Sequence, residues 1–213
     1  IPPDLKSLYS QERISWRGKT FLIVSDEPYI PWELIWPYMP NEWEDESPWS
    51  IQLKLTRWLR RDALGNGHEA PPSQLNLTTM ACIAPTDSNL PAAQEEADFL
   101  KALMVANGLS DVSPVPTWSE VIALLENGGY NWIHIAAHGS FYPESADTDS
   151  AIWLQDRRPL VPDSIVGVTI EGHIAKSRPA FVFNACHSGR QAWVLTRLGG
   201  WANRFISSGA GLF

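Results

Sequence analysis

Two strongly apolar segments of the chain end on residues that can carry out nucleophilic chemistry. The segment NWIHIAAHGSF, residues 131–141, reaches His138 and Gly139, and AFVFNACHSG, residues 180–189, reaches Cys186. A cysteine attacks carbonyl carbon as its thiolate, and histidine is the side chain suited to accept the thiol proton near neutral pH. The two segments therefore predict a His–Cys pair.

Backbone amides beside this pair are candidates for holding a negatively charged oxygen. Gly139 and the loop ACHSG can leave N–H groups free to stabilise a developing oxyanion. Many strands end in His-Gly or in Ala-Cys, so either motif alone is a weak signal. Their occurrence at equivalent ends of two strands, 48 positions apart, is more specific.

The two segments are predicted to be neighbouring central strands of a parallel sheet. WIHIAA and AFVFNA are apolar nearly throughout, as expected for strands covered on both faces. Neighbouring strands lie about 4.8 Å apart, so side chains at their ends can reach one another. Ligand sites in open α/β sheets gather beyond the carboxyl ends of the strands, where His138 and Cys186 fall.

The remaining chain alternates between strand and helix patterns. Thr117 is expected to cap a helix over 117–129, with Glu120 completing a capping box. The alternation predicts βαβ units, and hence an α/β fold with a mostly parallel sheet. We also expect strands at 20–25 and 75–85, helices at 90–108 and 162–170, a hairpin at 151–161, and over 191–209 a helix interrupted by Gly199 and Gly200. Residues 50–60 fit a strand or a helix, and the alternation at their start favours a strand.

Composition narrows the classes of function. The 213 residues fit one large domain or at most two small ones, and the net charge of −8 argues against direct nucleic-acid binding and against anionic membrane surfaces. The chain has only two cysteines, and it shows neither an apolar run of membrane-spanning length nor a signal peptide. These features favour a cytoplasmic protein. The first residue is not Met, which suggests a piece of a longer chain. Many of the eleven Trp residues lie within 16–58, which suggests an aromatic packing surface or an interface.

At HIAAHGSF and FVFNACHSGR the sequence resembles the CHAT group of caspase-like cysteine peptidases, in the clan of caspases, metacaspases and separase. FLIVSDEPYIPWELIW and AAQEEADFLKALM resemble earlier segments of the same family. The resemblance implies a three-layer α/β/α caspase-like domain over 1–213. Within it, 1–74 is a Trp-rich N-terminal part and 75–213 the catalytic core. The chain stops at SSGAGLF, where a further strand of the family would begin, so we expect a truncated fragment of a multidomain protein.

The resemblance also implies an activity. Cys186 would be the nucleophile, His138 the base and proton donor, and the amides of Gly139 and Cys186 the oxyanion hole of a cysteine endopeptidase. The implied partners are a protein or peptide substrate and an activating domain or subunit, in bacterial defence or programmed cell death, with no cofactor. The motif NACHSG differs from the QAC-x-G of animal caspases, so a preference for Asp at the cleavage site is not expected.

Other readings of these residues stay open. His138 can be an ordinary histidine at a strand end, and Cys82 reads as a core residue. His134 lies four residues before His138 and is expected to be a buried core histidine. His187 either faces solvent or lines the substrate pocket. A zinc site built from His134, His138, Cys186 and His187 lacks the usual ligand spacing, so no metal is expected.

Acidic residues near the predicted site are candidates for binding a basic substrate side chain, and Asp156 is the one we single out. For each residue taken individually, a solvated loop is the favoured reading; the others are Asp147, Asp149 and Asp163. The alternative function is a non-catalytic caspase-like module that binds a protein partner through its Trp-rich face.

Overall fold

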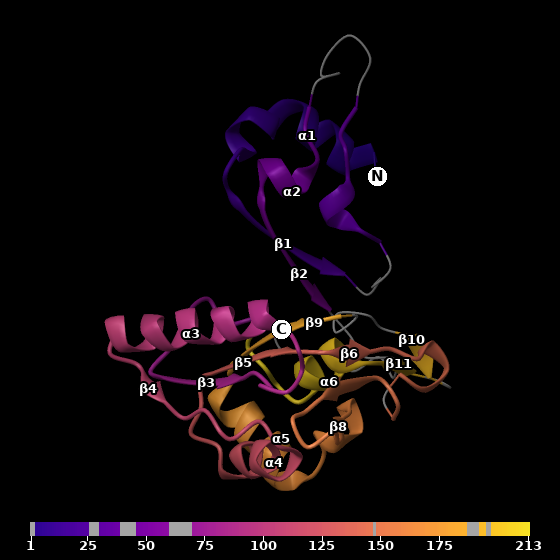
Figure 1. The fold of residues 1–213 in the computed structure, drawn as a ribbon. Coiled ribbons are helices and arrows are strands. Elements are labelled where there is room, and N and C mark those ends of the chain that lie inside the picture. Colours follow the sequence, from indigo (N-terminus) through magenta and orange to yellow (C-terminus); the bar gives the residue numbers. More distant parts are fainter. Residues whose placement is uncertain are drawn as a thin grey trace. The chain divides into compact units, whose positions relative to one another are not determined.

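The computed structural model describes residues 3–25, 30–38, 46–59, 70–146, 148–186, 192–194 and 197–213. The chain divides into two compact units, residues 1–60 and 61–213. Each unit has its own buried cluster of apolar side chains. We refer to residues 1–60 as the N-terminal unit and to residues 61–213 as the C-terminal unit (Figure 1).

The N-terminal unit combines helix α1 (Pro3–Trp16), the 3-10 turn η1 (Trp32–Leu34) and the short helix α2 (Trp49–Gln52) with two strands. Strands β1 (Thr20–Ser25) and β2 (Lys54–Leu59) pair in parallel. The alternation within 50–60 favoured a strand over a helix at the start of this segment, but the start forms α2 and the strand begins only at Lys54. Aromatic residues fill the core of this unit: Tyr9 and Trp49 are buried, with Trp16, Phe21 and Trp32 packed against them.

A four-stranded parallel sheet forms the centre of the C-terminal unit, in the order β4-β3-β5-β9. Its strands are β3 (Thr79–Ile83), β4 (Ser110–Asp111), β5 (Trp132–Ala137) and β9 (Ala180–Ala185). The connecting helices are α3 (Pro91–Ala106), α4 (Trp118–Asn127) and α5 (Val168–Ser177). The expected α/β fold with a mostly parallel sheet is confirmed.

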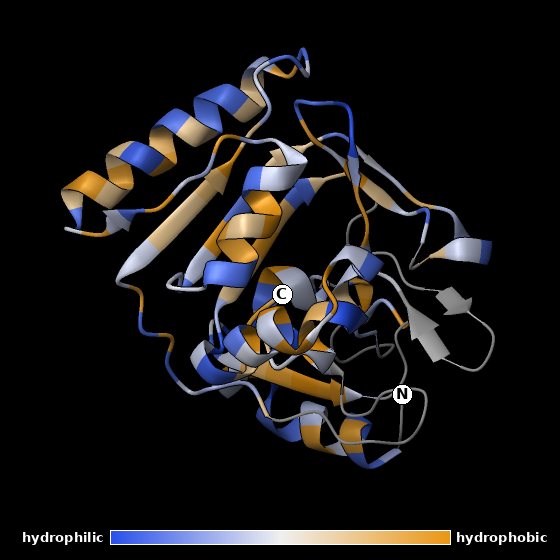
Figure 2. Ribbon diagram, turned by 90° about the horizontal axis from the view of Figure 1, so that it is seen from below, coloured by the Kyte–Doolittle hydropathy of each residue, from blue (hydrophilic) through white to orange (hydrophobic). Residues whose placement is uncertain are grey.

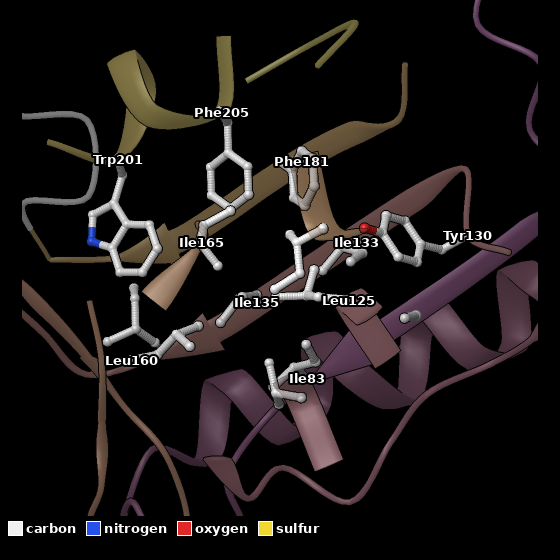
Figure 3. Close-up of a cluster of buried hydrophobic side chains, with 14 of the residues drawn as sticks. Ile83, Leu125, Tyr130, Ile133, Ile135, Leu160, Ile165, Phe181, Trp201 and Phe205 are labelled. Carbon is white, nitrogen blue, oxygen red and sulfur yellow. The ribbon is translucent and has the colours of Figure 1, made fainter. Parts of the chain in front are cut away.

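Helices cover both faces of this sheet (Figure 1). On one face, α3 packs its buried residues Ala97, Leu100 and Met104 against Met80 and Cys82 of β3. On the other face, residues of α4 and α5 pack against Ile133, Ile135 and Phe181, joined by Trp201 and Phe205 of α6 (Trp201–Ser207) (Figure 3). Figure 2 shows that the central strands are largely hydrophobic, whereas the helices also carry hydrophilic residues. The layers are those of a caspase-like α/β/α domain.

A small antiparallel sheet follows β5 directly. It consists of β6 (Gly139–Ser140), β7 (Ala151–Trp153) and β8 (Pro159–Leu160), with the 3-10 turns η2 (Pro143–Ser145) and η3 (Pro162–Ser164) beside it in sequence. The hairpin expected at 151–161 is confirmed as β7 and β8.

The last part of the chain differs from the prediction. Residues 192–194 and 197–199 form the antiparallel strands β10 (Ala192–Val194) and β11 (Arg197–Gly199), and the helix begins only at Trp201. Gly200 precedes the helix at φ 115°, a backbone conformation that favours glycine. The prediction of an interrupted helix over 191–209 was therefore wrong for its first part.

The C-terminal residues lie along the start of β9. Phe181 N donates a hydrogen bond to Leu212 O at 2.9 Å, and Leu212 forms a parallel bridge with Ala180.

Among the helices of the described ranges, none is both long and apolar enough to cross a membrane.

Candidate active site

The register between β5 and β9 brings the two predicted strand ends together. Ala137 pairs with Ala185 in the parallel ladder, and His138 and Cys186 are the next residues along each strand. Both residues are exposed at the carboxyl edge of the sheet. Adjacent strands therefore present a histidine and a cysteine at matching positions.

Gly139 allows the two strand ends to approach closely. A Cβ atom added to Gly139 would lie less than 3.0 Å from the backbone carbonyl oxygen of Cys186 and 3.3 Å from Ala185 Cβ. Backbone atoms cannot rotate away from such a contact, so only glycine fits here without a shift of the strands. The close approach of the Cys186 backbone thus explains why the residue after His138 is a glycine.

A backbone carbonyl holds the imidazole of His138. The Nε2 atom lies 2.8 Å from the Ser88 carbonyl oxygen, in the loop after β3. A carbonyl oxygen only accepts hydrogen bonds, so Nε2 carries the proton that this contact uses. In the neutral ring Nδ1 is then the unprotonated nitrogen, able to accept a proton from a thiol.

The backbone N–H of Gly139 is oriented away from the neighbouring strand β7. Trp153 N donates to the His138 carbonyl at 2.9 Å, which makes Gly139 and Ile152 a non-hydrogen-bonded pair of the antiparallel ladder. In such a pair the N–H groups point away from the partner strand. The Gly139 amide is therefore not used in the pairing with β7.

The two cysteines have opposite environments. Cys186 is exposed, whereas Cys82 is buried between β3 and α3, where burial raises the pKa of its thiol to about 11. At neutral pH, Cys82 is protonated and shielded from reagents, as its predicted core position implied.

His134 belongs to a polar network below the site. Its Nε2 lies 3.0 Å from Glu96 Oε1 on α3, and Glu96 Oε2 accepts a hydrogen bond of 2.6 Å from Asn184 Nδ2 on β9. Burial lowers the pKa of the His134 imidazole, and the Glu96 carboxylate offsets part of that effect. His134 therefore bridges sheet and helix from a buried position, and this partner was not visible in the sequence.

A pocket of about 340 Å³ opens beside His138. One part of its wall comes from the loop after β3 and another from the β7–β8 hairpin. The lining residues are Pro85, Asp87, Ser88, His138, Trp153, Leu154 and Arg157. Sequence reasoning missed all of them except His138, because they come from segments that only the fold brings together.

Asp156 makes contacts within the protein. Its carboxylate accepts hydrogen bonds from Trp118 N at 3.2 Å and Arg158 N at 3.3 Å, and it is not among the residues that line the pocket. Asp156 thus accepts a hydrogen bond from the first amide of α4. Thr117 was expected to cap this helix, but its side chain makes no capping hydrogen bond. Arg157, the neighbour of Asp156, does line the pocket.

The other candidate residues have separate locations. Asp163 forms an ion pair with Arg204 at 2.5 Å, and Asp149 is exposed. His187 and Asp147 lie outside the described residues. Within the described ranges, no group of three or more His, Cys, Asp or Glu side chains is arranged to hold a metal ion.

The family model described as CHAT domain matches residues 51–211, well over half of the chain. A comparison with curated proteins found no significant match.

Proposed function

The chain belongs to the CHAT domain family, of the caspase-like kind, and from this premise we propose that it is a cysteine endopeptidase with a dyad of His138 and Cys186. Membership of this family supports the assignment of a domain related to cysteine peptidases. The observation that carries the proposal is the β5–β9 register, with His138 and Cys186 following the paired residues Ala137 and Ala185.

The proposed reaction starts with transfer of the Cys186 thiol proton to His138 Nδ1. The thiolate attacks the peptide carbonyl carbon, and the amides of Gly139 and Cys186 hold the resulting oxyanion. His138 then gives its proton to the leaving nitrogen, the C–N bond breaks and an acyl-enzyme forms. Water, deprotonated by His138, releases the acid and restores the thiol.

The hydrogen bond to Ser88 supports the role of His138. Because the carbonyl fixes Nε2 as the protonated nitrogen, the ring keeps one tautomer and one orientation throughout the cycle. Ser88 is thus a positioning residue that acts through its backbone.

Reactivity toward iodoacetamide tests the dyad. The exposed Cys186 will react faster than the buried Cys82 in any case, so the informative quantity is the dependence of the Cys186 rate on His138. At pH 6 an ordinary thiol is less than about 1% thiolate, whereas a thiol paired with a histidine holds far more. We expect His138→Ala to slow alkylation of Cys186 at pH 6 about tenfold or more.

His173 provides a matched control for this measurement. It lies on α5 near Gly128, which precedes β5 and so belongs to the opposite end of the sheet. His173→Ala should leave the Cys186 alkylation rate unchanged. Equal rates in wild type and His138→Ala would contradict the dyad, and peptide cleavage that survives Cys186→Ala would contradict the peptidase function.

The substrate, activation and biological setting belong to the same proposal. We propose that the substrate is a protein or peptide and that a partner domain or subunit activates the enzyme, in a bacterial defence or cell-death-like pathway. The CHAT family membership supports this setting. Cleavage measured with and without the proteins encoded beside this chain in its genome tests the activation.

The second candidate is a non-catalytic module that binds a protein partner through its N-terminal unit. Large apolar side chains of this unit are exposed, among them Leu34, Trp36 and Ile51. Trp49 and Trp58, by contrast, are buried. This candidate predicts that binding of the partner survives Cys186→Ala and is weakened by Trp36→Ala.

A further inference from the structure

The pocket beside His138 lies where the order of strands reverses. Along the chain the strands run β3, β4, β5, β9, but in the sheet β4 lies on one side of β3 and β5 on the other. The chain thus goes from β3 to β4 on one side and then returns past β3 to β5 on the other side. In open α/β sheets the crevice at such a point, beyond the carboxyl ends of the strands, is the usual place for a ligand. Pro85, Asp87 and Ser88 follow β3, and His138 follows β5.

We propose that this pocket binds the side chain that follows the scissile bond, on the leaving-amine side, and that it selects an apolar or aromatic side chain. The assignment to the leaving side rests on the peptidase function proposed above.

The order of residues along the sheet edge gives the direction of the substrate. The Ser88 loop follows β3, His138 follows β5 and Cys186 follows β9, so His138 stands between the other two. The carbonyl carbon must meet Cys186, and the leaving nitrogen must come within reach of the proton on His138. The peptide therefore runs from the β9 side toward the β3 side, and the pocket, which His138 lines and Cys186 does not, receives the amine half.

The lining determines the class of side chain. Pro85 and Leu154 are buried, and Trp153 is 41% exposed, which leaves part of its surface for a ligand. The two ionised residues, Asp87 and Arg157, have opposite charges, so the lining has no net charge with which to select a charged ligand. A volume of about 340 Å³ leaves room for a leucine, methionine or phenylalanine side chain.

Hydrogen bonds hold the hairpin side of the pocket in place. Trp153 N is bonded to the carbonyl of His138 itself, so the aromatic wall is tied to the catalytic histidine. Arg157 N donates to Leu154 O at 3.0 Å, and Gln155 N donates to Pro116 O at 2.9 Å. The pocket is therefore formed before a substrate arrives, which favours selection by shape.

A peptide library randomised on both sides of the cleaved bond tests this selection. We expect the full chain to prefer leucine, methionine or aromatic residues directly after the bond. Trp153→Ala should reduce kcat/KM for such substrates about tenfold, leave glycine there unaffected, and keep the preference before the bond. Trp153→Phe should retain the selection, and Phe99→Ala, an exposed aromatic on α3, should change nothing. Cleavage without an apolar preference at that position, or a preference that survives Trp153→Ala, would overturn the proposal.

A binding measurement separates this pocket from the peptidase function. In Cys186→Ala protein, phenylalaninamide should shift the NMR signal of the Trp153 indole, assigned through Trp153→Phe, and glycinamide should bind at least tenfold more weakly. If neither amide binds, the pocket proposal fails even where cleavage is found. If phenylalaninamide binds but no Cys186-dependent cleavage occurs, the peptidase assignment and the leaving-side role fail, and the apolar selectivity stands.

Discussion

Replacing Gly139 with alanine tests whether the ends of β5 and β9 meet as closely as the site requires. The new Cβ would fall about 1 Å inside ordinary van der Waals contact with the Cys186 carbonyl oxygen. The obstacle is a backbone atom, so rotation of a side chain cannot relieve the overlap. Gly139 does not have a positive φ, and the close approach alone disfavours the substitution.

The expected magnitude follows from that overlap. To admit the methyl group, the strand ends must separate by about 1 Å, and a misplacement of that size costs about 100-fold in the rate of a positioned reaction. Overpacking of this kind destabilises a protein by about 1–3 kcal/mol, which in a chain of this length lowers Tm by roughly 2–4 °C per kcal/mol. The variant should therefore fold and react slowly.

The assay combines thermal unfolding with peptide cleavage and with the rate of Cys186 alkylation at pH 6. Gly172→Ala is the matched control: Gly172 lies within α5, and a Cβ there would have no atom within 4 Å. Alanine in a helix interior is favoured over glycine by up to about 1 kcal/mol, so the control should be as stable as wild type or more so, with full reactivity. Wild-type Tm and wild-type reactivity in Gly139→Ala would refute the close approach of the two strand ends.

Three further predictions concern single side chains. Lowering the pH from about 7 to about 5 should lower Tm, because burial lowers the pKa of His134 in the folded state and the unfolded chain therefore takes up that proton first. The stability that the neutral His134 contributes is complete above the ordinary pKa near 6.5 and is lost as the pH falls below it. His134→Gln should flatten the dependence of Tm on pH over that range. Asp156→Ala removes the acceptor for Trp118 N, so urea titration should give a loss of about 1 kcal/mol, and an unchanged midpoint would argue against the cap. Cys82→Ser places a hydroxyl in an apolar cluster and should cost about 1–3 kcal/mol in the same titration, whereas Cys186→Ser at the exposed position should leave stability unchanged.

Much of the C-terminal unit follows from local patterns. The apolar runs that became β5 and β9 are recognisable because a strand covered on both faces needs apolar residues at nearly every position. The helix over 91–106 shows a mixed polar and apolar pattern, which α3 resolves into a face buried on the sheet. The segment at 192–199 was mistaken for helix because apolar runs of this length fit either structure until pairing decides.

The residue types of the candidate site and their places at strand ends could be predicted from the chain alone, because strand periodicity and the glycine after His138 are local properties. The atoms that lie beside them come from distant segments that only folding brings together. Ser88 is 50 residues before His138, and Trp153 and Arg157 come from a hairpin that only the fold places beside the loop after β3. Asp156 shows the same limit, because the sequence does not distinguish an aspartate in a pocket from one at a helix end. Only its hydrogen bonds to the amides of Trp118 and Arg158 place it at the helix end.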